Sequence, residues 1–254
     1  MIDTHAHIDQ LDDLNGALMR AKEAGVTDVV AQSVDLASMG KVLDIAAQTN
    51  PIKVHPALGI HPGMVVKVEE QQAALDFLRT NIGKAMAVGE TGLDYQYKWV
   101  RKDEIERNKQ KVSFQFHLDL AKEHDLPIVI HARGAWRDCL AMTKAAGVKH
   151  ALFHWYSGPL DIMEQILTEG YFVSTSPSVG YSPESRAAMA QAPLERILIE
   201  TDSPVRYKET EDSYYLSEPK DVVRTLKALA ALKNMDEAEV LSKVNANARK
   251  LFRI

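Results

Sequence analysis

Two histidines stand near the start of the chain, at His5 and His7 in the motif DTHAH of residues 3–7. If this segment is a β-strand, its side chains alternate between two faces, so the two imidazoles point the same way about 7 Å apart. Two imidazoles on one face can bind the same divalent metal ion. Taken alone, the pair is equally compatible with two unrelated histidines, so a metal site needs further ligands.

Further polar side chains follow later apolar segments that have the length of buried strands. Each stands at or just beyond the end of such a segment: His61, Glu90, His131, His154 and Asp202. In a parallel barrel the carboxyl ends of all strands meet at one face, and that face carries the active site. We therefore expect these residues to meet His5 and His7 in space.

Four of the histidines and both carboxylates form one set of mixed nitrogen and oxygen ligands: His5, His7, His131, His154, Glu90 and Asp202. Such a set suits zinc, manganese or iron, and magnesium when phosphate oxygens complete the coordination. Six ligands exceed the needs of one tetrahedral ion with an open position. Two ions about 3.5–4 Å apart with a shared carboxylate are the economical arrangement, and Glu90 is the natural bridge.

Each residue also has a purely structural interpretation. His131 could be a core histidine bonded to a backbone carbonyl, and Glu90 and Asp202 could cap the helices that follow their strands. The shared position at strand ends favours a metal site over separate coincidences. Cys139 lies in a predicted helix without an adjacent base, so we do not expect a cysteine nucleophile. We find no glycine-rich phosphate loop of the GxGxxG or Walker type.

The elements that must position these residues alternate along the chain. Strands are predicted around residues 3–7 and at 29–31, 54–60, 85–88, 128–130, 151–153, 171–173 and 197–199. Helices are predicted at 11–24, 36–48 and 69–81, up to 124, up to 147, after 154, after 173, and from 219 onward. The strands are continuous apolar runs, as expected for burial on both faces. This alternation predicts an α/β fold, a (β/α)8 TIM barrel, with an open doubly wound sheet as the alternative.

The long helix that ends at 124 shows an apolar repeat. Val112, Phe116 and Leu120 recur four apart and predict its apolar stripe. His117 lies in the same helix, and we expect it to face the barrel or its rim.

The length, cysteine content and net charge of the whole chain limit the possible domain organisation and function. Its 254 residues suit one large domain, and we expect residues 1–254 to form a single hydrolase barrel. The sequence contains one cysteine, no signal peptide and no run long enough to span a membrane, which together favour a cytoplasmic protein. A net charge of −5 argues against coating nucleic acid by bulk electrostatics, but allows an enzyme that grips a few phosphates.

Several motifs occur in a recognisable order: DTHAH at 3–7, GIHP at 59–62, GETGLDY at 89–95, HAR at 131–133, His154 with SG at 157–158, and ETDSP at 200–204. Together they resemble the TatD family of metal-dependent hydrolases, from residue 1 to about Phe252. The HxH motif alone is shared by the wider amidohydrolase superfamily, whereas GETGLDY and ETDSP are specific.

The resemblance implies a TIM barrel, a site with one or two metal ions and phosphodiester hydrolysis, often as a magnesium-dependent deoxyribonuclease. It also implies residue roles: His5, His7 and Asp202 hold one ion, His131 and His154 hold a second, Glu90 is shared, and His61 and Arg133 contact the substrate phosphate.

The chain departs from the family pattern around the expected pocket. Trp155-Tyr156 stands where Cys-Phe is common, His117 falls where a glutamine is usual, and Val205-Arg206 replaces an aromatic residue and a leucine. The usual RNEP is reduced to SEP at 217–219. None of these positions is an expected metal ligand, so the departures bear on the substrate rather than on hydrolysis.

We expect a hydrolase of ester bonds that uses two divalent ions (Mg, Mn or Zn) to activate a water. Asp202 would take the proton from that water, Glu90 would bridge the ions, and Arg133 would stabilise charge on phosphoryl oxygens. The expected substrate is a single-stranded DNA end, because a barrel-top pocket does not easily admit a duplex.

Two loops give opposite indications about the substrate. Residues 95–102 mix aromatic and cationic side chains that could stack bases and hold phosphates, or could form an ordinary solvated loop. Residues 207–216 are acidic, which would repel a long polyanion and favour a small phosphodiester. The alternatives are a small-molecule amidohydrolase or phosphodiesterase, and a metal-binding barrel without catalysis. No obligate protein partner is indicated.

Overall fold

Eight short strands form the centre of the protein in a computed structural model that describes residues 1–65 and 68–254. The strands are β1 (Ile2–Ala6), β2 (Asp28–Gln32), β3 (Lys53–Leu58), β4 (Ala87–Gly92), β5 (Ile128–His131), β6 (Ala151–Phe153), β7 (Phe172–Thr175) and β8 (Ile197–Ile199). Each pairs in parallel with its neighbour in sequence. An isolated bridge between Ala6 and Ser203 joins the end of β1 to the chain beyond β8. The predicted (β/α)8 barrel is confirmed, and this sequential strand order excludes the doubly wound alternative.

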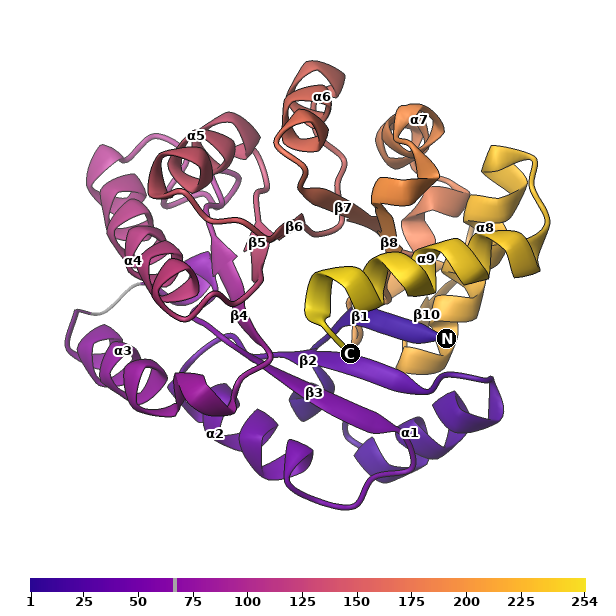
Figure 1. The fold of residues 1–254 in the computed structure, drawn as a ribbon, viewed down its shortest axis with the longest axis horizontal. Helices are drawn as coiled ribbons and strands as arrows, with labels where there is room; N and C mark the ends of the chain where they lie inside the picture. The colour runs from indigo at the N-terminus through magenta and orange to yellow at the C-terminus, as the bar shows by residue number, and fades with distance from the viewer. Residues whose placement is uncertain (66–67) are drawn as a thin grey trace.

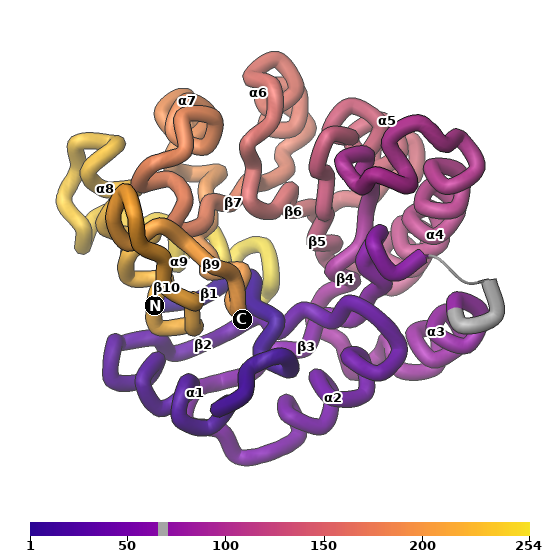
Figure 2. The backbone as a smooth tube through the Cα atoms, turned by 180° about the vertical axis from the view of Figure 1, so that it is seen from behind, coloured from indigo at the N-terminus to yellow at the C-terminus, as the bar shows by residue number. Residues whose placement is uncertain are grey.

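Most helices lie around the outside of the strands, and the C-terminal helix crosses one end of the barrel (Figure 1); Figure 2 shows the molecule from behind. The helices are α1 (Leu14–Glu23), α2 (Leu36–Ala46), α3 (Val68–Asn81), α4 (Glu104–Glu123), α5 (Trp136–Ala146), α6 (Leu160–Thr168), α7 (Pro183–Gln191), α8 (Val222–Lys233) and α9 (Glu237–Phe252). Aspartate caps explain several starts: Asp13 accepts a hydrogen bond from Gly16 N and Asp103 accepts from Ile105 N. The first helix therefore begins at Leu14 rather than at the predicted residue 11. None of the helices in the described part of the chain combines the length and apolar character needed to cross a bilayer.

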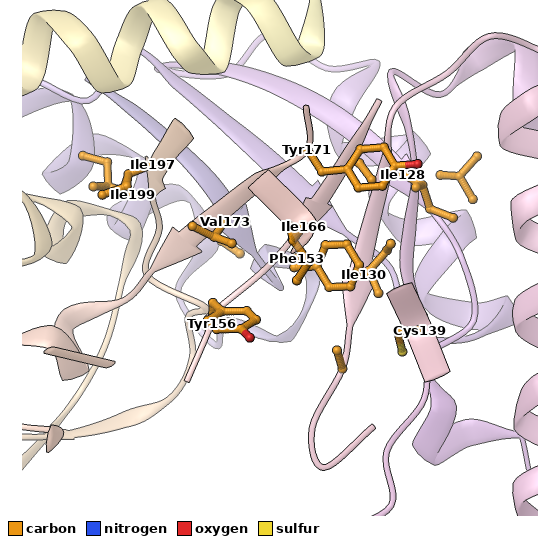
Figure 3. Close-up of a cluster of buried hydrophobic side chains, with 14 of the residues drawn as sticks. Ile128, Ile130, Cys139, Phe153, Tyr156, Ile166, Tyr171, Val173, Ile197 and Ile199 are labelled. Carbon is orange, nitrogen blue, oxygen red and sulfur yellow. The ribbon is translucent and has the colours of Figure 1, made fainter. Parts of the chain in front are cut away.

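A layer of apolar side chains fills the barrel, with one residue from each strand. Its members are Ile2, Val30, Ala57, Ala87, Val129, Leu152, Phe172 and Leu198, and Ala248, Leu251 and Phe252 of α9 pack against them. Alternate strand residues pack outward under the helices: Figure 3 shows Ile128, Ile130, Phe153 and Val173 in the buried cluster that also contains Cys139 of α5. Burial on both faces explains why the strands read as continuous apolar runs.

The predicted apolar stripe of α4 is wrong at Val112, whose relative exposure is 69%. The buried face of α4 combines apolar residues with the polar residues Gln110, Ser113 and His117. Of these, Gln110 and His117 form hydrogen bonds with loops. His117 faces inward as predicted, and its Nε2 accepts a hydrogen bond from Ile60 N at 3.0 Å. Of the three residues of the predicted stripe, Leu120 is buried and Phe116 packs against the core as expected, so the prediction fails at Val112 alone.

The acidic loop predicted at 207–216 contains an antiparallel hairpin of β9 (Arg206–Lys208) and β10 (Tyr214–Leu216). Tyr207 is buried, and its hydroxyl donates a hydrogen bond to the main-chain oxygen of Thr201 at 2.8 Å. The start of this segment is thus anchored beside the carboxyl end of β8.

A matched pair of substitutions tests this assignment of the core. Val129→Ala removes two buried methyl groups from the barrel interior and should lower the free energy of unfolding by about 2 kcal/mol. Val112→Ala makes the same change on the exposed face of α4 and should alter that free energy by less than about 0.5 kcal/mol. Urea unfolding followed by circular dichroism measures both, and equal losses would contradict the assignment.

Candidate metal centre

The alternation of side chains along a strand explains why His131 and His154 point into the mouth of the barrel. Val129 belongs to the inner layer and His131 stands two positions later; Leu152 and His154 have the same relation. Side chains two positions apart lie on the same face of a strand. The residues that fill the barrel therefore determine that these histidines point into its mouth.

In β1 and β4, a local irregularity is needed to direct the ligand side chains into the mouth of the barrel. His5 and Glu90 stand at odd spacings from the inner-layer residues Ile2 and Ala87, which would place them on the opposite face of a regular strand. The pairing register shifts within β1 against β2 and within β4 against β5. One extra residue exchanges the faces of the side chains beyond it, so His5 and Glu90 also point into the mouth.

The buried carboxylate of Glu90 has two groups of potential ligand atoms around it. Its Oε2 lies 3.4 Å from His5 Nε2 and 3.2 Å from His7 Nε2. Each of these nitrogens lies 3.3 Å from Asp202 Oδ1. One oxygen of Glu90 therefore completes a cluster with His5, His7 and Asp202.

The other oxygen of Glu90 faces the second group. Glu90 Oε1 lies 2.7 Å from His131 Nδ1, 2.8 Å from His154 Nε2 and 3.6 Å from His61 Nε2. His131 Nδ1 is also 3.4 Å from His154 Nε2. The structure thus brings all six predicted ligands together, with His61 beside them.

These separations fit a divalent ion. Ligand atoms bonded to one ion at about 2.1 Å lie about 3.0 Å apart at adjacent octahedral positions and about 3.4 Å apart in a tetrahedron. His5 Nε2 and Glu90 Oε2 are buried and have no hydrogen-bond partner among the described residues. Unpartnered buried polar atoms are costly, and a metal ion between them would supply the missing partner.

The hydrogen bond made by one ring nitrogen of a histidine determines whether its other nitrogen can bind a metal ion. His7 Nδ1 lies 3.2 Å from the main-chain oxygen of Gln32, which requires a proton on Nδ1. In neutral His7 the lone pair is therefore on Nε2, which can bind a metal ion. His61 is different, because its Nδ1 accepts a hydrogen bond from Gly63 N at 3.0 Å. In neutral His61 the proton then lies on Nε2, which can donate to a substrate oxygen but cannot bind a metal ion in that form. Proximity alone would group His61 with Glu90 and His131 as ligands.

Burial and neighbouring charges set the protonation states. Burial disfavours the His7 cation, but the neighbouring carboxylates of Asp202 and Glu90 outweigh this effect and raise the pKa of His7 to about 10. Burial also opposes ionisation of both carboxyls, yet the surrounding histidines hold the pKa values of Glu90 and Asp202 below their ordinary values. Burial lowers the pKa of His61 to about 3, so this imidazole is neutral at physiological pH.

Residues 2–253 match the family model described as TatD related DNase. The chain belongs to this family. It is 28% identical to the human deoxyribonuclease TATDN3, over 99% of this chain and 94% of that protein. It is 31% identical to the protein of Mycobacterium tuberculosis named uncharacterized metal-dependent hydrolase TatD, over 99% of this chain and 97% of that protein. The crystal structure of YjjV, a TatD homologue from Escherichia coli, matches with a TM-score of 0.88 at 27% identity and covers 100% of this chain and 98% of that one. The resemblance inferred from the motifs is confirmed.

Two carboxylates without a role in the sequence prediction orient histidines of this TatD-family site. Asp94 Oδ2 lies 2.9 Å from His131 Nε2, and Glu200 Oε1 lies 3.3 Å from His154 Nδ1. A carboxylate on the far nitrogen fixes the tautomer and the ring orientation of a metal-binding histidine. The sequence could have indicated a role for Glu200, because it stands two positions before Asp202 in the same strand-end motif.

The site opens into a cavity of about 500 Å³ whose lining includes His131, His154, Asp202 and Arg133. Its volume lies within the range of small-molecule pockets. Arg133 Nε donates to Asp94 Oδ2 at 2.8 Å, which leaves the rest of its half-exposed guanidinium free to reach a ligand. A larger depression of about 680 Å³, lined by residues between Lys22 and His55, contains none of these side chains.

Metal binding should release protons from this TatD-family site. A metal ion binds neutral imidazole, whereas the raised pKa of His7 keeps that ring protonated near pH 7 in the metal-free protein. We expect about one proton or more released on saturation with Mn²⁺, and an affinity that rises with pH from about 6 to 9. Calorimetric titration in two buffers with different ionisation enthalpies measures the protons, and identical heats would contradict the prediction.

Loss of an orienting carboxylate should weaken metal binding. Glu200→Gln removes the charge that faces His154 and should lower the affinity for Mn²⁺ by about 10-fold or more. Glu195→Gln makes the same change at an exposed residue that pairs with Lys243 and should leave the affinity unchanged. Calorimetry on both variants measures this, and an unaltered affinity in Glu200→Gln would refute the orienting role.

Proposed function

We propose that this TatD-family chain, as one domain of residues 1–254, hydrolyses phosphodiester bonds at single-stranded DNA ends with two divalent ions (Mg, Mn or Zn). One observation carries the proposal: the two oxygens of Glu90 face two separate groups of ligand atoms. A shared carboxylate of this kind suits a pair of ions in phosphodiester hydrolysis. The name deoxyribonuclease, carried by the human relative, supports DNA as the substrate.

The residues present fit both ions. In the proposed assignment His5, His7 and Asp202 would hold one ion, His131 and His154 would hold the other, and Glu90 would be shared between them. When bound, such ions lower the pKa of water and offset negative charge on phosphoryl oxygens.

Protein side chains supply the remaining chemistry. The lowered pKa of Asp202 keeps its carboxylate ionised at neutral pH, so that it can accept a proton from the attacking water. Arg133 is anchored through Nε to Asp94, and its terminal N–H groups can bond phosphate oxygens. His61 would donate from Nε2 to the same phosphate, which agrees with its tautomer.

An aromatic surface beside the cavity supports a nucleic acid strand as substrate. The rings of Tyr97 and Trp99 are stacked with centroids 4.4 Å apart, and Trp99 is 48% exposed. The Arg133 guanidinium lies 5.1 Å from the ring centre of Tyr97. Exposed aromatic rings next to a cation bind bases and phosphates of single strands without strong sequence preference.

A small phosphodiester is the second candidate. Glu184 and Asp202 both line the cavity, where Arg133 is the sole lysine or arginine among the described lining residues. The segment between β9 and β10 adds further negative charge at Glu209, Glu211 and Asp212. Such charges disfavour a long polyanion and leave a short substrate less affected.

We also propose a cytoplasmic location. The sequence contains a single cysteine, Cys139, which is buried and free. Burial raises the pKa of its thiol, which makes it unreactive, and a chain without disulfides suits a reducing compartment.

Metal-dependent cleavage tests the proposed function. Metal-stripped protein receives Mg²⁺, Mn²⁺ or Zn²⁺ in turn, and shortening of an end-labelled single-stranded oligonucleotide is followed. We expect cleavage that requires the ion and falls by about 100-fold or more in Glu90→Gln, because the neutral amide cannot bridge two ions. Glu195→Gln should cleave normally.

Near-normal turnover by Glu90→Gln would overturn the two-ion site. Absence of cleavage with every ion, in protein that still binds metal, would exclude the DNase and direct the search to small phosphodiesters and amides. Failure on those substrates as well would indicate a metal-binding barrel without catalysis.

A further inference from the structure

Trp155, directly after His154, has an unusual and firmly held conformation. Its φ angle is +40°, in the left-handed region that bulky residues rarely occupy. Its main-chain N–H donates to Ser174 Oγ at 3.1 Å, and its indole Nε1–H donates to Ser178 Oγ at 2.9 Å. Strained residues persist where the surroundings enforce them, and they cluster at functional sites.

The indole ring forms part of the wall of the candidate active-site cavity. It lies 5.5 Å, centre to centre, from the ring of the buried Tyr207, which supports it from behind the wall. The same cavity is lined by His154, Asp202 and Arg133. A rigid aromatic surface is therefore placed next to the groups that would act on a phosphodiester.

The rest of the lining indicates what this surface binds. Trp136 and Tyr181 also border the cavity, and Ser182 and Ser185 add hydroxyl groups. A ligand that matches this lining combines a flat ring, polar edges and a phosphate within reach of Arg133. A nucleotide has this combination, and base stacking on aromatic side chains is a common source of affinity.

We propose that Trp155 is a specificity-determining residue whose indole stacks against the base of the terminal nucleotide of the substrate. The inference rests on the proposed nuclease function and adds a base-binding subsite to it. Hydrogen bonding to Ser178 holds the ring in place before the substrate arrives, so little conformational freedom is lost on stacking.

A comparison of two substrates and three proteins tests the subsite. The substrates are oligonucleotides that differ only in whether the terminal nucleotide carries a base or is abasic. The wild-type protein should show a kcat/KM about 10-fold or more lower on the abasic end, the range expected from base–aromatic stacking. Trp155→Ala should lose about the same factor on the normal end and little on the abasic end. Trp155→Phe retains a ring and should retain much of the preference.

Two outcomes would overturn the proposal. Equal rates of the wild-type protein on both ends would show that no base is recognised. An equal loss by Trp155→Ala on both ends would show that the indole only supports the fold, and thermal unfolding of each variant would accompany the assay.

Failure of the nuclease function itself gives a separate result, since the wild-type protein would then cleave neither oligonucleotide. Calorimetric binding of dAMP and of 2-deoxyribose 5-phosphate decides the subsite in that case. About 10-fold tighter binding of dAMP to the wild-type protein, lost in Trp155→Ala, would support it. Equal binding of the two ligands would refute it.

Discussion

The contact between the first strand and the chain after the last strand holds the site together. Among the described residues a single bridge, rather than a ladder, pairs these segments. The buried Asp3 carboxylate compensates by accepting hydrogen bonds from Thr201 N at 3.0 Å and from its hydroxyl at 2.6 Å. Asp202 N then donates to His5 O at 2.8 Å. Side chains of β1 and of the segment after β8 thereby keep a fixed separation across the point where the barrel closes.

Much of the site could be predicted because a strand has a period of two. His131 and His154 follow core residues at even spacing, and their position at strand ends was enough to place them together. Spacing alone does not predict where Glu90 points, because its direction depends on a shift in register between β4 and β5. His5 and His7 were correctly predicted to lie together: His5 lies in β1, His7 follows its last residue, and their ring centres are 5.1 Å apart.

The partners of the site residues were harder to predict than the residues themselves. Asp94 supports His131, and the main-chain N–H of Asp94 in turn donates to Gln110 Oε1 at 3.0 Å. Gln110 lies on the buried face of α4, where an apolar repeat had suggested Val112. The loops that follow the strands have main-chain N–H and C=O groups that need hydrogen-bond partners. A helix packed against these loops therefore has polar residues on its buried face. Sequence periodicity detects burial of apolar side chains and is insensitive to this requirement.

The separation of His5 and Asp202 along the chain has a consequence for folding. An ion bound jointly by these two residues would act as a crosslink that closes a loop containing nearly the whole barrel. Crosslinks across long loops restrict the unfolded chain most, in the way that a disulfide does. Preferential binding to the folded chain would also add about 1.4 kcal/mol of stability for each tenfold excess of free ion over Kd. A metal ion at this position would then also hold β1 against the segment after β8, where the barrel closes.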